Sequence, residues 1–315
     1  MYHYSSKQLH IQEQTMSHPK LILSTVLGII VFTGFVAAQQ AQFMSPPPIC
    51  DLKDPEQMRV WAEYGAVFIS KDIKMPNTCI FDGQPAIDVY LKTTKLEALS
   101  ISDLRTFKLR PLARQSLEKV FVKMQAKGGY RAVVRLCNTR KVGECTNDVN
   151  GDFALRNYKQ TADNWTRNKV TFIANNGVKF TSDNPSNAQI VSVEVKSGEK
   201  PFMYSYAIPG ASQHILGLAI DVKNGTGING DSGYCETDCV KALADNYWYR
   251  TVRGDKYHFT YLGYPPEELR KRGLKTVQCD HEKARGLDQF IYWVPNISDY
   301  KGYENWPCKE VPWPL

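Results

Sequence analysis

Histidine is scarce in this sequence: six occur among 315 residues, and three of the six precede residue 21. The sequence also lacks an internal repeat, a long low-complexity tract and any Lys/Arg block with interleaved aromatic residues. The lack of such a block argues against nucleic-acid binding. The formal net charge of +7 is interpreted as an ordinary solvated surface. The three remaining histidines, His214, His258 and His281, are therefore the first candidates for chemistry.

Charge is missing from one long segment near the N-terminus. Residues 21–38 contain no Asp, Glu, Lys or Arg, and as a helix they would be about 27 Å long, close to the hydrocarbon thickness of a bilayer. The run ends in small residues where a signal peptidase could cleave. We therefore expect residues 1–38 to be a signal peptide or an uncleaved membrane anchor. The remainder is then exported (periplasmic, cell-envelope or secreted), and only this segment would contact a membrane.

Cysteine is absent from the apolar run and from everything before it. Eight cysteines follow, at positions 50, 79, 137, 145, 235, 239, 279 and 308. An even number in an exported chain predicts disulfides, although eight cysteines allow 105 pairings. Nearest-neighbour pairing would close four local loops, and buried reduced thiols are the alternative. Cys235 and Cys239 lack the tight spacing and the second pair of a structural zinc site.

Helical periodicity marks two segments. Pro111 opens the first, and residues 112–126 carry apolar side chains at helical spacing. The second is a short charged helix over residues 265–272.

Short apolar runs mark the expected strands. Residues 86–91, 130–136, 170–174 and 190–195 have the composition of strands, whereas residues 138–168 are polar and resemble an insertion or surface excursion. The absence of a βαβ rhythm favours an α+β fold, with a small antiparallel or mixed sheet and flanking helices.

The C-terminal part, residues 279–315, is rich in aromatic side chains. Trp293, Trp306 and Trp313 could stack on sugars, but packing against the domain is the favoured interpretation. Residues 39–110 are interpreted as a linker and N-terminal region.

The segment from 209 to 222 has unusual local chemistry. Its apolar residues suit a strand, yet His214 and Asp221 are seven positions apart, which places them on opposite faces of one continuous strand. For both to reach one metal the chain must bend, and Gly217 is where it could. Asp221 lies between Ile220 and Val222, so its carboxylate needs a cation if it is buried.

A second segment, residues 255–262, is strand-like and carries His258. Two imidazoles and one carboxylate form a three-ligand set that leaves the fourth position of zinc open to water. The alternative is that both histidines are ordinary hydrogen-bonded core residues. His281 is interpreted as a surface residue beside Cys279.

The first segment resembles a known family. Its pattern Ser212-x-His214-x-x-Gly217-x-Ala219-x-Asp221 matches the S-x-H-x-x-G-x-A-x-D motif of the D-alanyl-D-alanine carboxypeptidase and dipeptidase superfamily, also called hedgehog/D,D-peptidase. The resemblance is greatest to the vancomycin-resistance (VanY) type, whose motif is also preceded by Pro-Gly.

Two further stretches extend this resemblance. Residues 255–263, Asp-Lys-Tyr-His-Phe-Thr-Tyr-Leu-Gly, are similar to the family's E-x-W-H-F-x-Y-x-G motif, and Gly129-Tyr130-Arg131 resembles its upstream G-Y-R. The similarity covers residues 111–278, which are interpreted as the zinc D,D-carboxypeptidase-like domain.

The resemblance implies roles for individual residues. His214, Asp221 and His258 would bind Zn²⁺. Arg131 would stabilise the developing oxyanion or hold the substrate, and Ser212 would bind the substrate's terminal carboxylate.

The general base departs from the family pattern. The family has Glu three residues before its last ligand, whereas this sequence has Asp255. The aspartate side chain is about 1.5 Å shorter, yet a general base must come within about 2.6–3.2 Å of the water that it deprotonates. Tyr257 replaces the family's Trp at a substrate-binding position, which is a milder change.

The resemblance predicts a zinc-dependent peptidase that releases the terminal D-Ala of peptidoglycan stem peptides or of other D-Ala-D-Ala-terminated peptides. A peptidoglycan endopeptidase would use the same metal chemistry. A zinc-retaining binding module without turnover is a second alternative, favoured by Asp255, and a structural exported domain is a third.

Overall fold

The computed structural model describes residues 47–102, 105–126, 154–176, 186–187, 189–190, 206–224, 233–234, 237–279, 290–296 and 308–314. The apolar run at 21–38 and the expected strand at 130–136 lie outside these ranges. Contacts divide the chain into residues 1–39 and 40–315, and every described residue belongs to the second unit. Within the described ranges, no helix has both the length and the apolar character needed to cross a bilayer.

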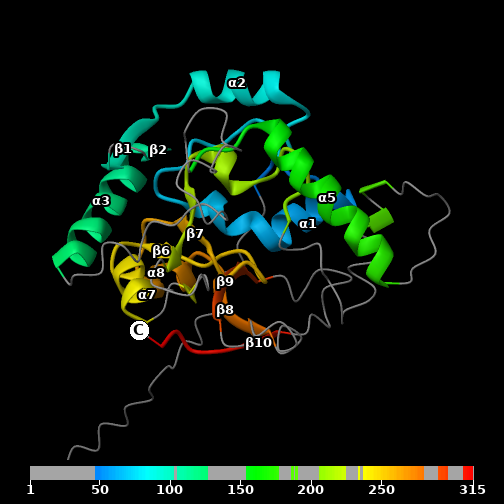
Figure 1. Ribbon diagram of the computed structural model, residues 1–315. Coiled ribbons are helices and arrows are strands. Elements are labelled where there is room, and N and C mark those ends of the chain that lie inside the picture. The colour runs from blue at the N-terminus through cyan, green and yellow to red at the C-terminus, as the bar shows by residue number, and fades with distance from the viewer. Residues whose placement is uncertain are drawn as a thin grey trace, which may run out of the picture. The chain divides into compact units, whose positions relative to one another are not determined.

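Helices and small antiparallel sheets build the described part of the chain (Figure 1). The helices, with 3-10 turns written η, are α1 (Pro55–Tyr64), η1 (Gly65–Ile69), α2 (Gln84–Lys92), α3 (Pro111–Ala126), α5 (Tyr158–Asn176), η2 (Gln213–Leu216), α7 (Thr237–Ala244) and α8 (Pro266–Lys271). The strands are β1 (Glu97–Ser102), β2 (Arg105–Leu109), β3 (Ala219–Asp221), β4 (Lys223–Asn224), β5 (Gly233–Tyr234), β6 (Trp248–Tyr249), β7 (His258–Tyr261), β8 (Leu274–Cys279), β9 (Tyr292–Pro295) and β10 (Cys308–Glu310). The content agrees with the expected α+β class.

Within the described residues, the strands form two three-stranded sheets and two two-stranded pairs. The orders are β3-β7-β6 and β10-β8-β9, and β1 pairs with β2 and β4 with β5. Every one of these described pairs is antiparallel. The sheet β3-β7-β6 carries two of the three candidate metal ligands, Asp221 at the end of β3 and His258 at the start of β7.

The N-terminal region packs into the same hydrophobic core as the later strands. Trp61 of α1 is fully buried in a cluster that also contains Trp248 and Trp293. The backbone N–H of Lys71 donates to the carbonyl of Leu262 at 2.9 Å, which ties this region to the end of β7. The domain limits at 110 and 278 remain a prediction, and this core extends across both of them.

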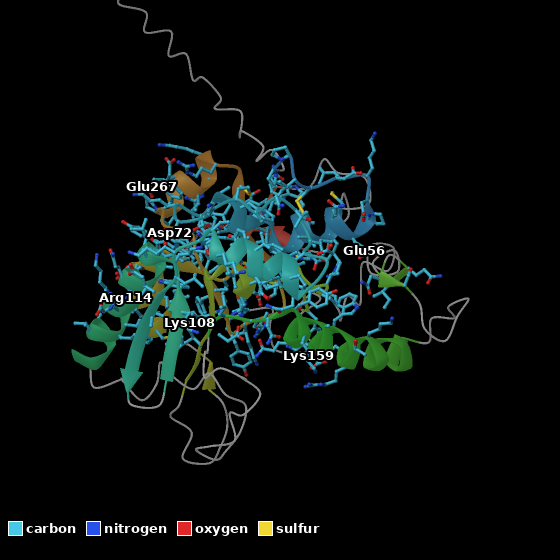
Figure 2. The ribbon with its side chains drawn as sticks, turned by 90° about the horizontal axis from the view of Figure 1, so that it is seen from above. Glu56, Asp72, Lys108, Arg114, Lys159 and Glu267 are labelled. Atoms are coloured by element: carbon cyan, nitrogen blue, oxygen red, sulfur yellow. A yellow bond between two sulfur atoms is a disulfide. The ribbon has the colours of Figure 1, made fainter. Side chains whose placement is uncertain are left out.

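Both expected helices are confirmed. α3 begins at Pro111 and ends at Ala126, and α8 covers Pro266–Lys271. The carboxylate of Asp72, labelled in Figure 2, accepts hydrogen bonds from the backbone N–H groups of Leu112 and Ala113 at 2.7 and 3.1 Å. A negative charge at a helix N-terminus satisfies free N–H groups and complements the helix dipole.

Two of the expected strands are wrong, because they are helical. Residues 86–91 lie in α2, where Ile87 and Tyr90 are buried three positions apart while Val89 is 62% exposed. Residues 170–174 form the later part of α5, a helix that also contains residues 158–168 of the expected surface excursion. A run of five or six apolar residues does not by itself distinguish a strand from a helix segment.

The disulfide and tail predictions are confirmed where the chain is described. Cys50 bonds to Cys79 and Cys279 to Cys308, both nearest-neighbour pairs, and Cys239 is also disulfide-bonded.

In the C-terminal part, the ring of Trp313 lies 5.6 Å from those of Trp293 and Tyr249, so the tail packs on the core.

Candidate metal centre

A tight bend brings His214 and Asp221 together. His214 lies in the 3-10 turn η2 rather than in a strand, and the bend predicted at Gly217 is present. Gly217 ends the turn with a φ of +68°, in the left-handed region that favours glycine, and its N–H donates to the carbonyl of His214. The chain then enters β3, which ends at Asp221. The bend leaves His214 Nε2 only 3.3 Å from Asp221 Oδ1.

Strand pairing supplies the third residue. His258 is the first residue of β7 and lies directly opposite Asp221 in the antiparallel β3-β7 ladder. Its Nδ1 is 3.4 Å from Asp221 Oδ1. The potential ligand atoms of His214, Asp221 and His258 all lie within 4.8 Å of one another. Both histidines are buried, and Asp221 is partly buried.

Hydrogen bonds fix which nitrogen of each imidazole faces the centre. His214 Nδ1 lies 2.8 Å from the carbonyl oxygen of Ala154, which can only accept, so Nδ1 carries the proton. His258 Nε2 lies 2.7 Å from the side-chain oxygen of Gln213, so Nε2 carries the proton there. In the neutral forms, Nε2 of His214 and Nδ1 of His258 therefore present lone pairs toward the carboxylate of Asp221.

The three side chains fit a metal cation. Two nitrogen lone pairs and a carboxylate oxygen converge on one small region, an arrangement that is unfavourable unless a positive charge lies between them. Two imidazoles and one carboxylate form a donor set typical of catalytic zinc, and metal-binding histidines usually donate their other N–H to an acceptor, as both do here.

Arg156 also reaches the centre, and the sequence did not reveal it. Its guanidinium forms an ion pair with Oδ2 of Asp221, the carboxylate oxygen not facing the histidines. Burial alone would raise the pKa of Asp221, but Arg156 and His214 outweigh it and hold the pKa well below its usual range. Arg156 precedes α5 within the polar stretch that was expected to be a surface excursion. No sequence motif there distinguishes a site arginine from a surface arginine. Arg131 lies outside the described residues.

Asp255 lies on the turn that leads into β7. Its backbone carbonyl accepts from the N–H of His258 at 3.2 Å, and its side chain accepts from the N–H of Tyr257 at 3.3 Å. Burial, and then the negative charge of Asp221, raise the pKa of Asp255. The Asp255 carboxyl group is thus close enough to Asp221 for the charge of that carboxylate to raise its pKa.

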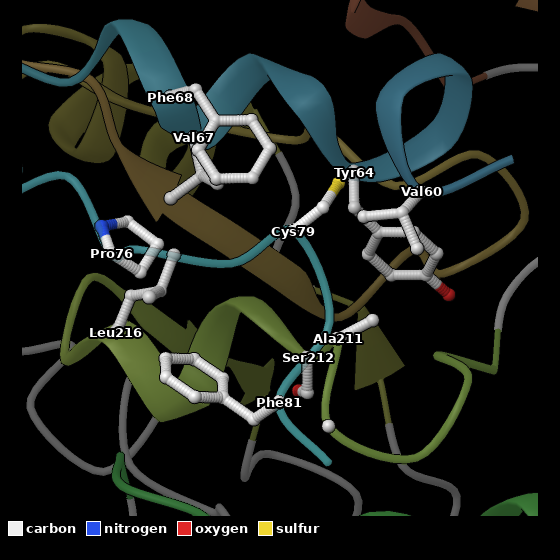
Figure 3. A pocket seen from close by; sticks show the side chains of 11 residues that line it. Val60, Tyr64, Val67, Phe68, Pro76, Cys79, Phe81, Ala211, Ser212 and Leu216 are labelled. Atoms are coloured by element: carbon white, nitrogen blue, oxygen red, sulfur yellow. The ribbon is translucent and has the colours of Figure 1, made fainter. Parts of the chain in front are cut away.

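Two of the candidate substrate-binding residues, Ser212 and Tyr257, lie in the described part of the chain, each within two positions of a candidate ligand. Ser212 precedes η2, is 4% exposed and lines a small pocket shown in Figure 3. Apolar side chains such as Val67 and Phe81 form most of that pocket. Tyr257 is partly exposed, and its carbonyl accepts from the N–H of Val222 at 2.8 Å.

Comparisons with known proteins give structural neighbours only. No family model and no curated protein matches the chain. It is similar to the vancomycin-resistance D,D-dipeptidase VanXYg in complex with a D-Ala-D-Ala phosphinate analogue, at 15% identity and a TM-score of 0.34, over 68% of each chain.

Two further solved structures are similar in the same way. One is the vancomycin-resistance D,D-pentapeptidase VanY in complex with Zn(II), at 19% identity and a TM-score of 0.32, over 54% of this chain and 79% of that one. The other is the L,D-carboxypeptidase DacB from Streptococcus pneumonia, at 16% identity and a TM-score of 0.28, over 57% and 92%. Because every TM-score is below 0.5, the function proposed below rests on this chain's own residues.

Proposed function

We propose that this protein is a zinc-dependent D-alanyl-D-alanine carboxypeptidase that removes the terminal D-Ala from peptidoglycan stem peptides. The observation that carries the proposal is the convergence of His214, Asp221 and His258, with the imidazole protons turned away from the centre. The motif from Ser212 to Asp221, which resembles that of the D,D-peptidases, supports the choice of substrate.

The other residues would then have separate roles around the ligands. Bound zinc would supply a Lewis acid for the scissile carbonyl and a coordinated water with a pKa near about 7. Asp255 would accept the proton of the attacking water and pass it to the leaving amine. Ser212 would bind the terminal carboxylate of the substrate, and Tyr257 would line the substrate site.

Arg156 is a second candidate for the arginine role that the resemblance gives to Arg131. Its guanidinium already lies at the centre, against Asp221 Oδ2. A fixed fork of N–H donors at this place could hold the substrate or stabilise the oxyanion that develops on the carbonyl oxygen.

Replacing Arg156 by alanine is expected to lower kcat/KM by about 10²–10³-fold, the usual cost of removing one donor to a developing oxyanion. Zinc content should not fall, because all three ligands remain. Arg156→Lys should recover only part of the rate, since an ammonium lacks the planar fork. The matched control is Arg131→Ala, measured on the same peptide. A large loss in Arg131→Ala with little change in Arg156→Ala would return the role to Arg131.

The substrate is tested by product analysis. Zinc-loaded protein is incubated separately with an acyl-D-Ala-D-Ala peptide and with a cross-linked muropeptide dimer, and the products are identified by mass spectrometry. We expect free D-Ala from the first and no separation of the second into monomers. Cleavage of the cross-link alone would overturn the exopeptidase assignment in favour of the endopeptidase.

A binding module is the second candidate, and Asp255 is the observation that favours it. A shorter carboxyl side chain at the base position could support zinc binding without turnover. Tight binding of the D-Ala-D-Ala peptide without release of D-Ala, in protein that holds stoichiometric zinc, would favour this candidate.

We also propose that the protein is exported, with residues 1–38 as leader or anchor. The disulfides Cys50–Cys79 and Cys279–Cys308 support this, because such bonds form and persist in oxidising compartments.

A further inference from the structure

The side chain of Gln213 is the centre of a buried hydrogen-bond network beside the candidate ligands. Gln213 is 1% exposed and lies between Ser212 and His214 at the start of η2. Its oxygen lies 2.7 Å from His258 Nε2 and accepts from the hydroxyl of Thr251 at 3.0 Å and from that of Thr260. Its amide nitrogen donates to the backbone carbonyl of Tyr64 at 2.8 Å.

This network determines the orientation of the amide. The Tyr64 carbonyl can only accept, so the amide NH₂ must face it and the amide oxygen must face His258. An amide oxygen 2.7 Å from a ring nitrogen requires a proton between the two atoms, and only the imidazole can supply it. His258 therefore carries its proton on Nε2, and its Nδ1 lone pair is free on the side of Asp221.

The anchor of the network lies far away in the sequence. Tyr64 is the last residue of α1, in the N-terminal region, whereas His258 begins β7. Gln213 thus connects the N-terminal region to one candidate ligand while its neighbour His214 is another. A polar group this deeply buried, with both ends of its amide bonded, is held in one geometry.

We propose that Gln213 is a positioning residue for the metal centre: it accepts the Nε2 proton of His258 and so holds the Nδ1 lone pair toward the metal. The inference rests on the zinc site of the proposed function. Removing an acceptor of this kind typically lowers metal affinity by about 10–100-fold.

Three variants separate this role from ordinary core packing. Gln213→Leu keeps the volume and removes the acceptor, so zinc affinity, measured by chelator competition, should fall by about 10–100-fold. Gln213→Glu loses the donor to the Tyr64 carbonyl but keeps an acceptor for His258, so it should bind zinc more tightly than Gln213→Leu. Thr251→Val is the matched control: it removes a hydroxyl that bonds to the same oxygen and to Thr260 but leaves the acceptor for His258, so affinity should change by less than about threefold.

A purely structural role predicts the opposite order for the two Gln213 variants. A buried charge disturbs a core more than leucine does, so Gln213→Glu would then bind zinc more weakly than Gln213→Leu, and that result would overturn the inference. Equal affinity of wild type and Gln213→Leu would overturn it as well, while leaving the proposed function intact. No zinc binding by wild type would overturn both.

The wild-type protein gives an independent readout if Gln213→Leu does not fold. Nitrogen-15 NMR of the metal-free protein reports which ring nitrogen of His258 carries the proton. We expect a proton on Nε2 that exchanges slowly with water, because it is buried and hydrogen-bonded. A proton on Nδ1 would contradict the inference.

Discussion

Asp255→Asn is expected to lower the release of D-Ala by about 10²–10⁴-fold, the usual contribution of a general acid–base group. Asparagine has the same size and keeps an oxygen for the Tyr257 N–H, but it cannot accept the proton of the attacking water. Zinc content should remain at the wild-type level, because Asp255 is not among the three converging ligands. The measurement is kcat/KM on the acyl-D-Ala-D-Ala peptide, with zinc determined on the same sample.

Asp255→Glu is the matched control for this prediction. It restores the side chain that the D,D-peptidase motif has at this position, with about 1.5 Å more reach. If the turn before β7 already places Asp255 for catalysis, the glutamate variant should stay within about tenfold of wild type. A gain of more than about 100-fold would mean that wild type lacks a working base, and would favour the binding-module alternative.

The second large effect is expected from the ligands themselves. His258→Ala leaves one imidazole and one carboxylate. Losing only the hydrogen-bond partner of a ligand lowers metal affinity by about 10–100-fold, and losing the ligand itself should lower zinc affinity further. D-Ala release should become undetectable, because the water and the carbonyl both lose their activating group.

His281→Ala is the control for the loss of a histidine, since His281 is the remaining histidine after residue 38. It should keep both zinc and activity. Loss of zinc in His281→Ala together with retention in His258→Ala would contradict the proposed ligand set.

Local sequence patterns predicted the parts of the centre that lie close together in the chain. The separation of His214 and Asp221 required a bend, and the structure has it at Gly217. The expected strand around His258 is present as β7. In these segments a glycine and a short strand-like run carry enough information, because neighbouring residues set the local geometry.

Contacts between distant segments could not be predicted in the same way. Arg156 and Asp221 are 65 residues apart, and Gln213 and Tyr64 are 149 apart, so no local pattern links them. The strand predictions at 86–91 and 170–174 failed for a related reason. Which side of a short apolar run is buried depends on the element packed against it, which the run itself does not specify.

The most direct test of the central claim is the zinc content of purified wild type and of His214→Ala, determined side by side by elemental analysis. We expect one zinc per chain in wild type and none in the variant, with both proteins folded. The absence of zinc from wild type, or equal zinc in the two proteins, would contradict it.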